Sequence, residues 1–355
     1  MKTNKISTLT LSFTVAGAFI GAGFVSGNEL HGFFASHGRY ALFTFPFALV
    51  LLGIICNKFI VFCKRESTTS IRTCIFPKSP EFVKSLFVFS QIVFYFFLCV
   101  IMTSGFMALV NSYLGKSASL TAGVLFTLLV CVCIFSGLET LVRLFSLFVP
   151  LLIVTTVIIS LLYLSKNGLE IPHTPLSSTS FLSAVWTALL SVSYNFFSCI
   201  GIFAPLSVKM QKEKSVLHSC IAGISYLLLI GGGIILSLFS AKDFASRDLP
   251  MLEIAKSISL PLSVFYALLL ISAMFTCSVT SGICVFEWVK IKFKMSNFRR
   301  LCVCAVFCVL FYRLSLIGFS TLINTVYSFF GYIGFAVIIA VFINSGGYNV
   351  QKHKG

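Results

Sequence analysis

The sequence has little charge: only 10% of its 355 residues are Asp, Glu, Lys or Arg, and just 10 of them are acidic. An ordinary soluble domain has about 25% charged residues. With 58% hydrophobic residues, the chain could not cover its own core with a polar surface. The composition therefore excludes an ordinary soluble protein and indicates an integral membrane protein.

Signatures of catalysis are also missing. The sequence has no HExxH motif, and its five His residues are scattered. Most of the 13 Cys residues lie inside apolar stretches without paired spacing, so we expect small buried side chains, not disulfides or a zinc site. The net charge of +16 comes from Lys and Arg between apolar runs, which does not indicate nucleic-acid binding. We expect no enzymatic activity, no bound cofactor and no nucleic-acid partner.

Long apolar runs dominate what remains, and a membrane span needs about 20 such residues. We expect an all-α membrane protein with ten transmembrane helices at 6–27, 40–63, 82–112, 118–136, 138–165, 181–207, 215–240, 260–287, 299–317 and 319–343. The first run is too long for the apolar region of a signal peptide. The polar residues 344–355 are expected to form a tail, with Gly346 and Gly347 ending the last helix.

The distribution of Lys and Arg gives an orientation. If the N-terminus is cytoplasmic, 19 of the 26 basic residues fall in cytoplasmic segments and seven on the other side. Cytoplasmic loops are normally the ones rich in Lys and Arg. We therefore expect a multi-pass protein of the bacterial cell (inner) membrane, in contact with the lipid bilayer, with both termini in the cytoplasm. We expect a monomer or a weak homo-oligomer.

Two of the expected helices contain residues that weaken a helix. The first has Gly17, Gly21, Gly23 and Gly27 near its middle, which favours local unwinding, although Gly17 and Gly21 could instead serve close helix packing. The sixth has the following helix-weakening or polar residues: Asn195, Ser198, Gly201 and Pro205. Interrupted helices at matching positions of two halves point to a transporter site. The sequence thus predicts a 5+5 inverted repeat, 1–165 and 181–343, with broken first and sixth helices.

The motif GAFIGAG at residues 17–23, followed by FVSGNEL, resembles the first-helix signature of the bacterial YkvI-like membrane proteins. These are members of the amino acid–polyamine–organocation (APC) superfamily, which has the LeuT-type fold. The resemblance extends over essentially the whole chain in length, number of spans and positions of the breaks. It implies a transporter fold but does not define a substrate.

The LeuT-type resemblance implies a sodium site between the first and eighth helices. Sodium-coupled relatives have Gly-x-x-x-Gly-x-Gly in the first helix and a small residue followed by Thr-Ser in the eighth, and both patterns occur here. The residues expected to bind sodium are Gly17, Ile20 and Cys277 through backbone carbonyls, and Thr280 and Ser281 through side-chain oxygens. Alternatively, Thr280 and Ser281 could donate to carbonyls one turn earlier. A second sodium site is not expected, because Phe24 replaces the Asn of sodium-coupled amino acid carriers.

Proton coupling is the alternative. Some relatives replace this sodium with a basic side chain of the fifth helix, but Arg143 lies near the cytoplasmic end and can pair with Glu139. Three other residues are candidate proton carriers, because ionisable groups within a membrane are costly: Glu29, His31 and His218. Glu29 and His31 could instead lie at a water-exposed helix end or pair with Arg39.

The solute is expected to bind between the two breaks. Amides at the start of the outer half of the first helix, at Ala22 and Gly23, would suit a carboxylate, and Phe24 would shape the pocket. The remaining candidates come from the third and sixth helices: Gln91, Tyr95, Asn195, Phe196 and Ser198.

The function expected from this sequence is secondary active transport of a small amino acid-like or amine solute, coupled to sodium. The alternatives are a proton-coupled transporter and a solute-sensing receptor subunit on the same fold. A channel is not favoured, because no polar filter or charged ring is visible in the sequence.

Overall fold

The computed structural model describes residues 8–65, 79–134, 139–172, 180–207, 213–293 and 297–352, and these ranges fold into helices without a β-strand. Eight helices within them are long and apolar enough to cross a membrane. They correspond to the second to eighth and the tenth expected spans: α4 (Ala41–Arg65), α6 (Glu81–Leu114), α7 (Lys116–Ile134), α8 (Glu139–Asn167), α9 (Phe181–Ser207), α10 (Glu213–Ser240), α13 (Leu260–Phe293) and α16 (Ser328–Lys352).

The other two expected spans differ from a simple long helix. The first is divided into α1 (Thr8–Phe19), α2 (Ala22–Val25) and α3 (Asn28–Phe33). The ninth corresponds to α14 (Asn297–Ser315), whose described apolar part, Cys302–Ser315, is shorter than a span. Short helical segments precede two of the long helices: η1 (Ala35–Tyr40) leads into α4, and α15 (Phe319–Leu322) with the π-helical turn η2 (Ile323–Tyr327) leads into α16.

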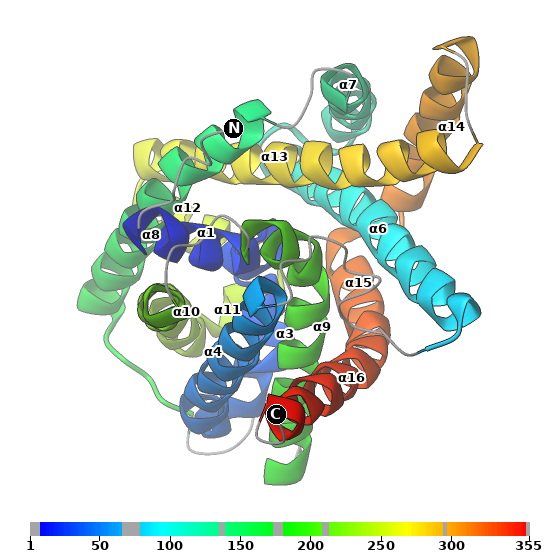
Figure 1. Cartoon of the computed structure of the whole chain (residues 1–355). Helices are drawn as coiled ribbons and strands as arrows, with labels where there is room; N and C mark the ends of the chain where they lie inside the picture. Colours follow the sequence, from blue (N-terminus) through cyan, green and yellow to red (C-terminus); the bar gives the residue numbers. More distant parts are fainter. Residues whose placement is uncertain are drawn as a thin grey trace.

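The helices pack in two groups (Figure 1). One group contains α6, α7, α13 and α14, in which α6 and α7 each contact both α13 and α14. In the other, α1 packs on α10 and α4 packs on α9, while α8 and α16 flank them. The contacts come in matching pairs: α1 with α8 matches α9 with α16, and α10 with α8 matches α4 with α16.

The sixth expected helix is not broken, contrary to the sequence-based expectation. α9 runs without interruption from Phe181 to Ser207. Its polar side chains satisfy carbonyls of the same helix: the Asn195 amide donates to Ser191 O (3.0 Å) and the Ser198 hydroxyl to Asn195 O (2.8 Å). Pro205 falls in the last turn, where the loss of one backbone donor does not divide the helix.

The last helix also differs from the expectation. α16 continues to Lys352, past Gly346 and Gly347, so these glycines do not end it. A glycine costs a helix about 1 kcal/mol relative to alanine, which is too little to terminate a long apolar helix by itself.

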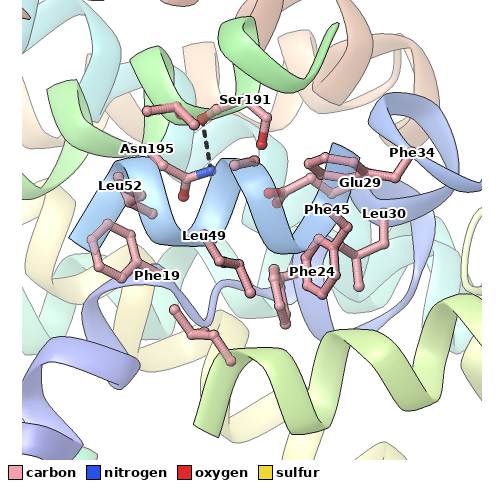
Figure 2. Close-up of a pocket in the computed structure, with 13 residues that line it drawn as sticks. Phe19, Phe24, Glu29, Leu30, Phe34, Phe45, Leu49, Leu52, Ser191 and Asn195 are labelled. Carbon is pink, nitrogen blue, oxygen red and sulfur yellow. Dashed lines mark hydrogen bonds between the residues drawn. The ribbon is translucent and has the colours of Figure 1, made fainter. Parts of the chain in front are cut away.

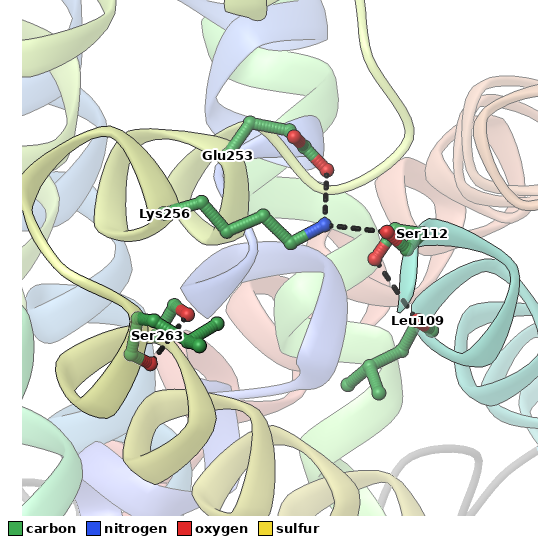
Figure 3. A network of polar contacts seen from close by, with 6 residues as sticks. Leu109, Ser112, Glu253, Lys256 and Ser263 are labelled. Atoms are coloured by element: carbon green, nitrogen blue, oxygen red, sulfur yellow. Dashed lines mark hydrogen bonds and ion pairs between the residues drawn. The ribbon is translucent and has the colours of Figure 1, made fainter. Parts of the chain in front are cut away.

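The polar stretch between α10 and α13 forms two short helices, α11 (Lys242–Ala245) and α12 (Pro250–Ile258). Lys256 ties α12 to the end of α6 (Figure 3): its ammonium donates to Ser112 O (2.7 Å) and Glu253 Oε1 (3.2 Å), and lies 4.2 Å from the centre of the Tyr113 ring. Ser112 is in the last turn of α6, where carbonyls lack helical partners and attract cations.

Candidate functional site

The first expected helix is interrupted at Ile20 and Gly21, as predicted from its glycines. The Gly21 amide donates to Phe19 O (3.0 Å), not to Gly17 O four residues earlier. The Ile20 amide still bonds to Ala16 O, and the next described bond across the break runs from Val25 N to Gly21 O. Among the described hydrogen bonds, the carbonyls of Gly17 and Ile20 therefore lack the helical donors four residues later.

The space around Gly21 argues against the alternative role in close helix packing. A Cβ atom placed on Gly21 would meet no atom within 4 Å. Close packing through a small-residue motif would instead bring a neighbouring helix against this position. The helix break, not a helix contact, accounts for Gly21.

The outer part of this span is shorter than expected. A turn at Gly27, with φ of 86°, separates the four residues of α2 from the six of α3. This left-handed conformation is one that glycine adopts readily. The amides of Ala22 and Gly23, expected to face a carboxylate, therefore begin a helix of only four residues, which has little cumulative dipole.

A small cavity lies between the break, α3, α4 and α9 (Figure 2). Its volume is about 20 Å³, enough for one or two water molecules. The polar side chains on its wall are Glu29, Ser191 and Asn195, and the aromatic ones are Phe19, Phe24, Phe34 and Phe45. Figure 2 shows the Glu29 carboxyl group pointing toward Ser191 and Asn195.

Glu29 is buried, with 4% of its surface exposed, so it does not lie at a water-exposed helix end. Its side chain interacts with that of Asn195 on α9 and lies close to Tyr327 on η2. One carboxyl oxygen, Oε2, is 3.2 Å from where a Cβ atom on Gly23 would lie. Glu29 therefore occupies the space beside the interrupted backbone.

The structure brings three of the eight candidate solute-binding residues to this region: Gly23, Phe24 and Asn195. The side chain of Ala22 lies outside the described part of the chain. Gly23 O accepts a hydrogen bond from the Ser26 hydroxyl (3.1 Å), and Phe24 and Asn195 line the cavity.

The other four candidates join helices to one another. Gln91 and Tyr95 on α6 donate to Phe197 O and Ser198 O of α9, each at 3.3 Å. Phe196 is fully buried and packs edge-on against Phe59 of α4. These contacts hold α9 between α4 and α6, and none of these four side chains lines the cavity.

On α13, the residues expected to bind sodium lie in a continuous helix. Thr280 donates its hydroxyl to Thr276 O one turn earlier (2.8 Å), which is the alternative role that the sequence allowed. Ser281 is buried, and the half-buried Cys277 lies near Cys199 on α9. Cys199 in turn donates its thiol to Ala18 O at the end of α1 (3.2 Å).

The remaining candidate proton carriers, His31 and His218, do not line the cavity. His31 is half-buried on α3, and His218 is exposed near the start of α10. Arg39 is exposed beside the ring of Tyr40, and the ion pairs described for this chain do not include one with Glu29. The side chains of Glu139 and Arg143 lie outside the described part of the chain.

Several residues near Glu29 were not singled out from the sequence. Tyr194 on α9 stacks on Tyr327 of the π-helical turn, with ring centres 4.5 Å apart, and on Phe33 at 5.4 Å. Within the part of the chain that is described, the buried Tyr194 hydroxyl has no hydrogen-bond partner. Single π-helical turns often mark functional sites but have no clear sequence signal.

Comparison with known proteins adds to this geometry. No protein-family model matches the chain. It is 26% identical to the uncharacterised membrane protein YkvI of Bacillus subtilis, in an alignment covering 96% of this chain and 97% of YkvI.

Solved structures with the same fold are transport proteins. They include inward-facing Mhp1 (TM-score 0.63, 12% identity, 95% of this chain and 76% of Mhp1) and a Na⁺-coupled sialic acid symporter (TM-score 0.64, 13% identity, 95% and 78%). A manganese transporter from Eremococcus coleocola is also similar (TM-score 0.60, 13% identity, 94% and 78%). The chain is thus a multi-pass membrane protein that is homologous to YkvI and has the LeuT-type fold.

Proposed function

We propose that this protein is a secondary active transporter for a small amino acid-like or amine solute, working by alternating access. The observation that carries the proposal is the interrupted first helix, which lies beside a cavity containing a buried carboxyl group. Interrupted helices near the membrane midplane are typical of solute and ion sites in transporters. The shared fold with Mhp1 and the sialic acid symporter supports the same function.

The proposed architecture is ten spans arranged as a 5+5 inverted repeat, with only the first helix interrupted. The paired contacts support it, because an inverted repeat relates α1 to α9, α4 to α10 and α8 to α16. We further propose that the protein lies in the bacterial inner membrane with both termini cytoplasmic, as the distribution of Lys and Arg favours.

Sodium is the proposed coupling ion. Its ligands would be the carbonyl oxygens of Gly17, Ile20 and Cys277 and the hydroxyl oxygens of Thr280 and Ser281. The released carbonyls of Gly17 and Ile20 support this assignment. The Thr280 hydroxyl uses its proton toward Thr276 O, so the lone pairs of its oxygen can still bind a cation.

This assignment predicts the result of a double substitution. Sodium should raise the Tm of the wild-type protein, because a ligand stabilises the state it binds. Thr280→Ala with Ser281→Ala should abolish this increase, measured by thermal shift in sodium chloride against choline chloride. Ser272→Ala is the matched control, because Ser272 donates to Leu268 O on the same helix away from the break. Sodium-dependent stabilisation that survives the double substitution would eliminate the site.

Proton coupling through Glu29 is the second candidate, favoured by the burial of this carboxyl group in the cavity. Solute uptake into reconstituted vesicles distinguishes sodium coupling from proton coupling. A sodium gradient alone should drive solute uptake if sodium is the coupling ion, whereas a pH gradient alone should do so if Glu29 carries the proton. A receptor subunit would bind the solute, but neither gradient would drive accumulation.

A further inference from the structure

Glu29 is a buried carboxyl group without a cationic partner among the described residues. An ionised carboxyl group that is buried without a cationic partner is strongly destabilising. Glu29 is 4% exposed, and in the described ranges the ion pairs involve other carboxylates: Glu81, Glu253 and Glu287. This carboxyl group is therefore suited either to hold a proton or to meet a cation that arrives with a ligand.

The titratable and charged groups around Glu29 do not supply that cation. His31 lies two residues further along α3, a spacing that places it on another face of the helix. Tyr327 of η2 and Tyr194 of α9 are phenols, which carry no positive charge. His37 of η1 is engaged with the Thr187 hydroxyl (3.0 Å). Arg39 is exposed over the Tyr40 ring. On the connection before α12, Arg247 is exposed at the surface.

The wall of the cavity matches an ammonium group. Such a group donates up to three hydrogen bonds, and two acceptor side chains lie on the cavity wall: the Glu29 carboxylate and the Ser191 hydroxyl (Figure 2). Asn195 acts as a donor beside them: its Nδ2 donates to Ser191 O (3.0 Å), and its side chain forms a hydrogen bond with that of Glu29.

The aromatic side chains complete the match. Phe19, Phe24, Phe34 and Phe45 line the same cavity, with Phe34 and Phe45 in edge-to-face contact at 5.1 Å. The face of a phenylalanine ring attracts a cation, and aromatic cages are a recurrent means of binding ammonium groups. The cavity volume of about 20 Å³ suits an ammonium group, and the rest of a solute would require the cavity to widen.

The same arrangement disfavours a carboxylate. Glu29 Oε2 lies next to Gly23, at the interrupted backbone where a solute carboxylate was expected from the sequence. Two carboxylates sharing one site repel each other unless one is protonated. The Glu29 carboxylate therefore occupies the position beside Gly23 that the carboxylate of an amino acid solute would otherwise take.

Building on the proposed transport function, we propose that Glu29 and Ser191 bind the ammonium group of the solute in the cavity that these phenylalanines line, with Asn195 orienting the Glu29 carboxylate. The solute class is then small organic cations lacking a carboxylate, and not amino acids.

Three compounds with three carbon atoms test this proposal: propylammonium (a cation), propionate (an anion) and β-alanine (a zwitterion). Binding to the full-length protein in lipid nanodiscs is measured by calorimetry at constant sodium and ionic strength. We expect propylammonium to bind at least about tenfold more tightly than the other two, and Glu29→Gln to weaken it by at least about tenfold. Glu287→Gln is the control, because Glu287 forms a partly exposed pair with Lys290 and should leave binding unchanged.

The proposal would be overturned by any of three results: β-alanine or propionate binds more tightly than propylammonium, Glu29→Gln binds propylammonium as tightly as wild type does, or none of the three compounds binds. If Glu29→Gln does not fold, labelling of wild-type Glu29 by dicyclohexylcarbodiimide decides: protection by propylammonium supports the site, and unchanged labelling refutes it. Glu29-dependent binding without uptake into vesicles would support this inference and refute transport. Uptake of β-alanine that does not depend on Glu29 would support transport and refute this inference.

Discussion

Tyr266 on α13 forms a hydrogen bond with the short helix α2 that follows the break. Its side chain is fully buried, and its hydroxyl donates to Val25 O at the end of α2 (2.6 Å). Because α2 has only four residues, its last carbonyls depend on partners from other helices. Tyr266 thereby links the interrupted first span to the helix that carries Thr280 and Ser281.

Tyr266→Phe should destabilise the protein by about 1–3 kcal/mol, because it leaves the buried Val25 carbonyl without its donor. A lower Tm in a thermal shift assay would show this effect. The control is Tyr332→Phe, since Tyr332 is 55% exposed on α16 and should change the Tm little. An equal Tm for Tyr266→Phe and wild type would mean that this hydrogen bond does not support the break.

At the residue scale, the sequence predicted the break better than it predicted the site. Gly21 and Gly23 indicate unwinding because glycine costs a helix the most backbone entropy. The partners of Gln91 and Tyr95, by contrast, are carbonyls of α9 more than a hundred residues away. Only the packed structure determines whether such a side chain meets a solute or a neighbouring helix.

α9 and α16 approach each other closely around Ser193 and Gly334. The Ser193 hydroxyl donates to Gly331 O (2.6 Å). A Cβ atom on Gly334 would clash with Ser193 O, a backbone atom that cannot move independently of its helix. The absence of a side chain at Gly334 therefore sets the distance between α9 and α16.

Gly334→Ala should destabilise the protein by about 1–3 kcal/mol by forcing the two helices apart. Gly232→Ala, in the middle of α10, is the matched control because a Cβ atom there would meet no atom within 4 Å. It should leave stability unchanged or raise it by up to about 1 kcal/mol through helix propensity. Thermal unfolding of both variants measures the difference, and equal effects would refute the packing argument.

At the scale of helices, polar residues alone do not predict a break. The sixth expected helix contains Asn195, Ser198 and Pro205, yet α9 is continuous because the first two bond to carbonyls of the same helix. In a membrane, serine and asparagine can satisfy an intact helix as readily as an unwound one. Clustered glycines in the first helix provide no such bonds, so that helix opens.

The connection between α10 and α13 joins the two helix groups. Met251 N donates to Ser26 O (2.9 Å), and Asn28 Nδ2 donates to Asp248 O (3.2 Å) and Ser320 Oγ (2.6 Å). Lys256 attaches the same connection to α6. The first span, the start of the last span and the other helix group are therefore linked on one side of the membrane.

Asn28→Ala should loosen this side of the molecule, because it removes the side-chain amide that joins α3 to the connection and to α15. Tryptic cleavage at the exposed Arg247 should become about tenfold faster. This is the effect of losing about 1.4 kcal/mol of the free energy that favours the closed form over the locally opened one. Asn167→Ala is the control, because the Asn167 amide donates only within α8, to Tyr163 O. An unchanged cleavage rate would show that the Asn28 contacts do not hold this side closed.

For the whole molecule, composition and apolar runs were sufficient to predict a helical membrane protein and eight of its spans. The first expected span, 6–27, is not among these eight, because its interruption divides it into short helices. The grouping of α6, α7, α13 and α14 could not be predicted from apolar runs, since lipid-facing and helix-facing residues have similar hydropathy in a membrane.

Solute accumulation in proteoliposomes tests the central claim most directly. With the purified protein reconstituted, radiolabelled propylammonium should accumulate above its external concentration under an inward sodium gradient or an imposed pH gradient, and collapse of the gradient should release it. Empty vesicles and vesicles containing Glu29→Gln should not accumulate it. A protein that binds small solutes but moves none of them under any imposed ion gradient would contradict the assignment as a transporter.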